Sequence, residues 1–171
     1  IHEYVKWANY LYEHELRRDA SLKDLQFPFP YRPGQRELAV SVYKAIAREK
    51  NLFIQAPTGV GKTLSTVFPA VKAMGEQMAD KVFYLTAKSI TRTVAEEAFR
   101  ILREHGMYLN TVAITAKEKL CFLEEISCNP DDCPYARGHF DRVNDAVYEI
   151  IHTEQGIGRE EILRYAREYR V

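Results

Sequence analysis

The chain has 171 residues, of which 46% are hydrophobic and 28% are charged, and its 24 Lys and Arg residues balance 24 Asp and Glu residues. This composition is typical of one globular domain, or of one domain with a small annex, and it excludes a disordered chain, a collagen-like repeat and a disulfide scaffold. Because the net charge is zero, a nucleic acid or an anionic membrane would have to bind a local patch.

The hydrophobic periodicity predicts helices that alternate with short strands in the first two thirds of the chain. Three prolines exclude a helix or a central strand from residues 27–34. The expected elements are a helix at 1–18, the connector at 27–34, a helix at 35–49, a strand at 52–56, a helix at 64–78, a strand at 82–86, a helix at 90–101 and a strand at 111–115. Such alternation indicates βαβ units, so the fold class expected is α/β, with a parallel sheet and flanking helices.

Beyond Thr115 the strand pattern stops and the sequence predicts a mainly helical part. One amphipathic helix is expected at 140–151 and a final helix at Arg159–Tyr169, and we interpret Gly156-Ile157-Gly158 as the turn between them. The expected organisation is therefore an N-terminal helical segment at 1–26, an α/β part at 27–115 and a helical, cysteine-containing part at 116–171.

The strongest motif is Ala56-Pro57-Thr58-Gly59-Val60-Gly61-Lys62-Thr63, which lies between a predicted strand and a predicted helix, as a phosphate-binding loop does. The glycines allow successive amides to point into one concavity, and the start of the helix adds partial positive charge. Lys62 is placed to reach the β and γ phosphates, and the Thr63 hydroxyl to bind Mg²⁺. The expected nucleotide-binding residues are Pro57, Thr58, Gly59, Val60, Gly61, Lys62 and Thr63, with catalytic roles for Lys62 and Thr63. The alternative is a glycine turn beside a solvated lysine.

A nucleotide-hydrolysing enzyme of this kind also needs a second apolar strand that ends in an acidic residue, to hold Mg²⁺ and position water. The acidic pairs of this sequence lie in helical patterns, and the predicted strands at 82–86 and 111–115 end in threonine. We therefore expect this chain to hold a nucleotide but to be inactive in hydrolysis by itself, with the acid located beyond Val171.

All three cysteines, Cys121, Cys128 and Cys133, lie within one short stretch that contains a polar turn. Such a cluster predicts a metal site that needs a fourth ligand. The fourth ligand could be His139, which would make a zinc site of three cysteines and one histidine, or a cysteine beyond Val171, which would suit an iron–sulfur cluster. Free cysteines in a core are the remaining alternative.

Taken in order, these motifs resemble the iron–sulfur helicases of superfamily 2, the XPD/DinG group, in its bacterial form. The resemblance rests on Phe29-Pro30-Tyr31, on Arg32-Pro33-Gly34-Gln35, on the loop at 56–63 and on Tyr84-Leu85-Thr86-Ala87-Lys88. It implies a partial RecA-like motor domain, interrupted by a helical iron–sulfur insert that begins near Thr115.

The resemblance also implies roles for individual residues. Gln35 would read the adenine edge of ATP, and Thr86, Lys88 and Arg92 would contact the phosphates of a single DNA strand, although solvated surface is the alternative for these three. Cys121, Cys128 and Cys133 would be the first three ligands of a 4Fe-4S cluster, with the fourth expected shortly after Val171.

The function expected from the resemblance is that of a fragment of an ATP-dependent DNA helicase, which uses ATP and Mg²⁺ to move on single-stranded DNA and to open duplex junctions. The protein would act in the bacterial cytoplasm, at the nucleoid, in DNA repair, as a monomer and without a membrane partner. Two other classes compete with this expectation: a zinc-stabilised nucleic-acid-binding module, and a phosphate-loop NTPase that moves no nucleic acid.

Overall fold

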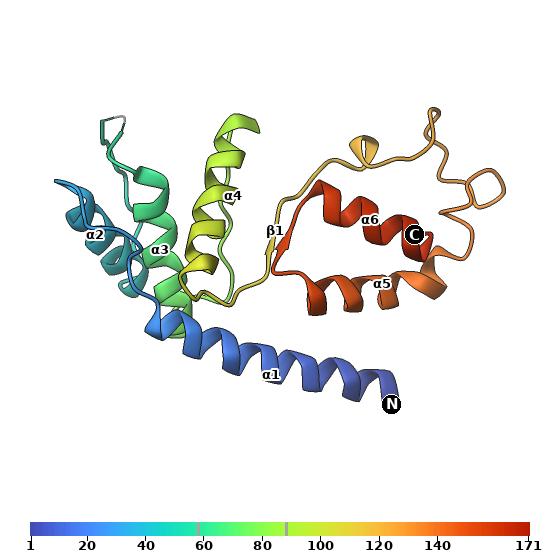
Figure 1. Ribbon diagram of the computed structural model, residues 1–171, viewed down its shortest axis with the longest axis horizontal. Helices are drawn as coiled ribbons and strands as arrows, with labels where there is room; N and C mark the ends of the chain where they lie inside the picture. Colours follow the sequence, from blue (N-terminus) through green and yellow to red (C-terminus); the bar gives the residue numbers. More distant parts are fainter. Residues whose placement is uncertain (58, 88) are drawn as a thin grey trace. The chain divides into compact units, whose positions relative to one another are not determined.

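A computed structural model of the chain describes residues 1–57, 59–87 and 89–171 (Figure 1). The chain forms two compact units, Ile1–Leu109 and Asn110–Val171, and each has its own hydrophobic core. Among the described residues, no helix combines the length and the apolar character that crossing a membrane requires.

The first unit is helical in its regular structure. Its helices are α1 (His2–Asp24), α2 (Gln35–Ala47), α3 (Lys62–Gly75) and α4 (Ser89–Glu104). In Figure 1, α3 lies between α2 and α4, and it contacts both of them. The helices predicted from periodicity are therefore confirmed, and α1 continues six residues past the predicted end at Arg18.

The core of this unit lies where α3 meets the end of α1 and the end of α4. Its buried members are Leu22, Leu25, Val67, Val71, Met74, Leu102, Met107 and Leu109. At Gly75, the helices α1 and α3 approach so closely that an added Cβ would lie 2.6 Å from the Cβ of Leu22. A glycine is therefore required at this crossing.

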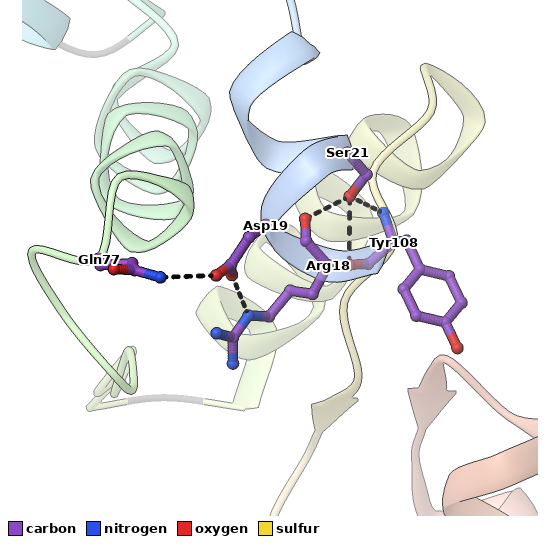
Figure 2. Close-up of polar contacts among 5 residues, drawn as sticks. All are labelled: Arg18, Asp19, Ser21, Gln77 and Tyr108. Atoms are coloured by element: carbon purple, nitrogen blue, oxygen red, sulfur yellow. Dashed lines mark hydrogen bonds and ion pairs between the residues drawn. The ribbon is translucent and has the colours of Figure 1, made fainter. Parts of the chain in front are cut away.

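Polar contacts hold the end of α1 against the segment that follows α4 (Figure 2). The Ser21 hydroxyl accepts a hydrogen bond from the Tyr108 amide at 2.9 Å and donates one to the Arg18 carbonyl at 2.8 Å. Asp19 accepts hydrogen bonds from Arg18 at 2.7 Å and from Gln77 at 3.5 Å. Burial acts to raise the pKa of the Asp19 carboxyl, but the hydrogen bond and charge of Arg18, together with the Gln77 hydrogen bond and the charge of Lys23, outweigh it and hold that pKa below its ordinary value.

Among the described residues, the structure forms only a small part of the parallel sheet predicted for 52–56, 82–86 and 111–115. Strand pairing occurs there at Thr111–Val112 alone, which is β1, and not at 52–56 or 82–86. The side chains of Phe53 and Leu85 are 96% and 88% exposed. An apolar run becomes a strand only when a neighbouring strand takes up its backbone hydrogen bonds, and the described residues pair no segment with these two runs.

The second unit contains β1, a short 3-10 helix η1 (Lys117–Lys119), α5 (His139–Thr153), β2 (Gly156–Ile157) and α6 (Arg159–Tyr169). The helix predicted at Arg159–Tyr169 is confirmed. The interpretation of Gly156-Ile157-Gly158 as a turn is wrong, because Gly156 and Ile157 pair in parallel with Thr111 and Val112. By contacts, residues 110–115 therefore belong to the unit that contains α5 and α6.

The core of the second unit lies between α5, β2 and α6. Its buried residues are Ile150, Ile157 and Tyr165. Arg142 of α5 donates hydrogen bonds to the carbonyls of Tyr169 at 3.0 Å and of Arg170 at 2.6 Å, so its guanidinium satisfies carbonyls that α6 leaves free at its C-terminus.

Candidate functional site

The loop before α3 contains two glycines with a left-handed backbone. Gly59 and Gly61 have positive φ values of 86° and 79°, a conformation that residues with a Cβ rarely adopt. Gly61 is also the N-cap of α3, and it has no side chain that could bond to the first amides of the helix. The loop therefore leads the backbone directly into a helix N-terminus, where the amides and the helix dipole favour an anion.

The Lys62 side chain lies over this loop. Its ammonium group donates hydrogen bonds to the carbonyls of Ala56 at 2.8 Å and Pro57 at 2.9 Å. Thr63 follows in the first turn of α3 and is half-buried, as is Val60 in the loop. The structure therefore brings together Pro57, Gly59, Val60, Gly61, Lys62 and Thr63, whereas Thr58 lies outside the described residues.

Gln35, at the start of α2, lies against Gly61 of the same loop, although it precedes Gly61 by 26 residues in the sequence. Its side chain is buried, with 5% of its surface exposed, and a Cβ on Gly61 would lie 2.6 Å from its Nε2. Its Oε1 accepts a hydrogen bond from the Arg32 backbone amide at 3.0 Å, and the Gln35 backbone amide donates to the Arg32 carbonyl at 3.0 Å. Gln35 thus packs between the connector and Gly61.

Arg32 also contacts the loop, and the sequence analysis did not include it among the site residues. Its Nη1 donates a hydrogen bond to the Gly59 carbonyl at 3.0 Å. Arg32 lies three residues before Gln35, in a segment on which the resemblance to the XPD/DinG group rests. Its position in that segment could have pointed to a role beside that of Gln35.

Aromatic residues of the connector pack beside α3. The rings of Phe27 and Tyr31 stack with their centroids 4.2 Å apart, and Phe27 meets Phe68 of α3 edge-on at 5.3 Å. Burial raises the pKa of the Tyr31 hydroxyl, and the charge of Arg36 opposes this effect. These contacts fix the connector that carries Arg32 onto the helix that follows the loop.

The residues expected to bind DNA are described only in part. Thr86 is half-buried, and Lys88 lies outside the described residues. Arg92 is exposed on α4 and forms an ion pair with Glu96, in which Nε and Oε1 are 3.5 Å apart. The structure therefore leaves the role of these three residues as a prediction.

The cysteines do not form a ready metal site as the structure places them. Cys121 is half-buried, Cys128 is exposed and Cys133 is buried. In the parts of the chain that the structure describes, no three His, Cys, Asp or Glu side chains are grouped so that they could hold a metal ion. Hydrogen bonding and electrostatic interaction with Cys128 raise the pKa of the Lys117 ammonium group. His139 begins α5, and its ring lies edge-on to Phe140 at 5.3 Å.

Comparison with known proteins identifies a family that matches the chain. The family of DEAD/DEAH box helicases matches residues 33–137, which is more than half of the chain and includes the phosphate-binding loop. A stretch of 47 residues is 43% identical to the protein named Probable ATP-dependent helicase MJ0942 from Methanocaldococcus jannaschii, and it covers 27% of this chain and 7% of that relative. No solved structure matches the chain.

The family match has two consequences. A DEAD/DEAH box helicase domain implies a RecA-like fold for the matched region, which includes the loop at 56–63. The stretch shared with the Methanocaldococcus jannaschii relative is 7% of that protein, so the activity of a whole protein does not follow from it. The family follows from the match over residues 33–137. The chain belongs to the DEAD/DEAH box helicase family.

Proposed function

We propose that the chain is the ATP-binding part of an ATP-dependent DNA helicase. The observation that carries the proposal is the loop between residue 56 and α3, with two glycines at positive φ and Lys62 folded over the loop carbonyls. The family match supports a helicase in general, and the resemblance to the XPD/DinG group supports DNA as the nucleic acid.

The residues of the loop fit ATP with Mg²⁺. The backbone at Gly59 and Gly61, followed by the N-terminus of α3, offers amide donors to phosphate oxygens, and the Lys62 ammonium adds a full positive charge. The half-buried Thr63 would place its hydroxyl near the metal ion, as in other phosphate-binding loops. ATP would supply the phosphoanhydride bond whose hydrolysis drives movement, while these residues bind and orient its phosphates.

The test of this proposal is Lys62→Ala in the intact protein. Because the ammonium stabilises charge on the transferred phosphate group, ATP turnover should fall by about two orders of magnitude or more. Lys44→Ala is the matched control, because Lys44 is an exposed lysine in the last turn of α2 and should leave turnover unchanged. Full activity of the Lys62 variant would refute the role of the loop.

The nucleic-acid part of the proposal has a separate readout in the same assay. Single-stranded DNA should stimulate ATP turnover by the intact protein, because a helicase couples hydrolysis to movement along a strand. We include Thr86, Lys88 and Arg92 as the residues that would contact strand phosphates. If the rate of ATP turnover is the same with and without single-stranded DNA, the result would favour a phosphate-loop NTPase that moves no nucleic acid.

We further propose that Cys121, Cys128 and Cys133 are ligands of a 4Fe-4S cluster, as in the XPD/DinG group. Support comes from their spacing and from the resemblance, whereas their placement in the structure does not fit a preformed site. Iron, acid-labile sulfide and zinc should be measured on anaerobically purified intact protein and on its Cys128→Ser variant. We expect about four irons and four sulfides per chain, lost in the variant. One zinc without sulfide would support the zinc-stabilised alternative.

The setting of this activity is proposed from the resemblance alone. The protein would work as a monomer in the bacterial cytoplasm, on single strands and duplex junctions at the nucleoid, in DNA repair.

A further inference from the structure

The segment from Arg32 to Gln35, which leads into α2, meets the phosphate-binding loop at both of its left-handed glycines. Arg32 donates from Nη1 to the Gly59 carbonyl at 3.0 Å, across 27 residues of sequence. Gln35 lies against Gly61, with Nε2 at 2.6 Å from the position of a Cβ there. The two contacts come from one short segment, so they act on the loop as a pair.

The backbone of Arg32 is a fixed anchor for its side chain. Its amide donates to the Gln35 side chain and its carbonyl accepts from the Gln35 amide, so both of its backbone polar groups are bonded. Pro33 restricts the backbone of the residue before it, and Gly34 adopts a positive φ of 77° to begin α2. The guanidinium therefore extends from an anchored backbone to the loop.

The contact with the Gly59 carbonyl also sets the direction of the next amide. The peptide unit between Gly59 and Val60 is planar and trans, so its C=O and N–H point in opposite directions. A glycine at positive φ has little steric resistance to rotation of its peptide, and an added Cβ at Gly59 would meet no described atom within 4 Å. Without Arg32, this peptide could turn and present an oxygen where the loop needs a donor.

We propose that Arg32 is a positioning residue that holds the Gly59–Val60 peptide so that the Val60 amide is available to phosphate. This inference rests on the proposed function of the loop, and it assigns to Arg32 a role in binding any polyphosphate, independent of the base. It acts through the loop backbone, and its contribution is that of one charge-assisted hydrogen bond at an exposed position.

The first experiment measures the affinity of the intact protein for ATP, GTP and inorganic tripolyphosphate. Arg32→Ala should weaken all three by a similar factor of about three to ten, because a single hydrogen bond to a charged group is lost. The control is Arg36→Ala, which removes the same charge from the first turn of α2 and should change affinity less than about twofold. Thermal unfolding of the Arg32 variant should match the wild type.

Three results would overturn the proposal. A loss confined to ATP would mean that Arg32 reads the base, and equal losses in the Arg32 and Arg36 variants would mean that it acts only as a distant charge. No loss in the Arg32 variant would mean that the loop holds its shape unaided.

A second experiment needs no nucleotide and keeps this inference separate from the proposed function. The NMR order parameter of the Val60 amide in the nucleotide-free intact protein should fall in Arg32→Ala, because the peptide is then free to turn, and stay unchanged in Arg36→Ala. An unchanged order parameter in the Arg32 variant would overturn the positioning role. If Lys62→Ala has no effect on turnover while the order parameter responds as expected, the proposed function fails and the positioning role of Arg32 stands.

Discussion

Gly59 and Gly61 share a left-handed backbone but have different surroundings. At Gly59 an added Cβ would meet no described atom within 4 Å, whereas at Gly61 it would meet the Gln35 side chain. The first glycine is therefore required by backbone conformation alone, and the second also by close packing.

This difference predicts an order of stabilities. Gly59→Ala should lower the free energy of unfolding by about 1 kcal/mol, the cost of a left-handed alanine. Gly61→Ala should lower it further, because the methyl group displaces the buried Gln35 amide from its bond with Arg32. Urea denaturation of the intact protein measures both values. The double variant Gly61→Ala with Gln35→Ala should recover part of the loss; if the two effects simply add, the packing explanation is wrong.

The sequence was enough to locate this site but not to show its contacts. The loop at 56–63 is local, so glycine spacing and the flanking patterns reveal it. The position of the Gln35 side-chain amide depends on a turn that lets the Arg32 backbone amide donate to its Oε1. The hydrogen bond from the Arg32 side chain to the Gly59 carbonyl joins residues far apart in sequence. Such contacts follow from packing, which periodicity does not record.

Among the elements, α1 and α3 of the first unit cross in close contact at Gly75. Leu22 is fully buried and Gly75 allows the two helices to touch, while the Lys72 ammonium donates to the Lys23 carbonyl near the end of α1. The helix α3, which begins at the phosphate-binding loop, therefore packs with its C-terminal end against α1.

This crossing predicts a strong dependence on one side chain. Leu22→Ala should lower the free energy of unfolding of the first unit by about 2–5 kcal/mol, because it leaves a cavity between the helices. Leu16→Ala, at a position 57% exposed on the same helix, should cost less than about 0.5 kcal/mol. Denaturant unfolding of both variants is the measurement. Equal effects would show that α1 is not packed as described.

Helices were easier to predict than strands because their hydrogen bonds are internal. The sequence pattern predicts both ends of α6 correctly, because the hydrogen bonds and side-chain contacts of a helix join residues that are close in sequence. Gly156 carries no strand signal and joins β2 only because Thr111, from a distant part of the chain, pairs with it. The apolar runs at 52–56 and 82–86 indicate burial, but a sequence does not state which segment will lie beside them.

At the scale of the whole molecule, the chain has two cores and two sets of stabilising contacts. One core joins α1, α3 and α4, and the other joins α5, β2 and α6. Units with separate cores can open separately, so each should have its own stability against local unfolding.

Arg142→Ala tests this separation. Loss of the guanidinium leaves C-terminal carbonyls of α6 without donors and should weaken the second unit by about 1–3 kcal/mol. Amide hydrogen exchange should accelerate within Asn110–Val171 and stay unchanged within Ile1–Leu109. Asn144→Ala, an exposed position on α5, is the control. Faster exchange throughout both units would contradict separate cores.

The parallel pairing of Thr111 with Gly156 places the two ends of a long segment side by side. The entropy of closing such a segment grows only with the logarithm of its length, so residues can be added or removed between the paired strands at small cost. α5 and the three cysteines lie within that segment, and the loop at 56–63 lies outside it. The pair can therefore hold the ends of this segment in place when residues are added or removed in its irregular stretch between η1 and α5, outside the core that α5 forms with β2 and α6.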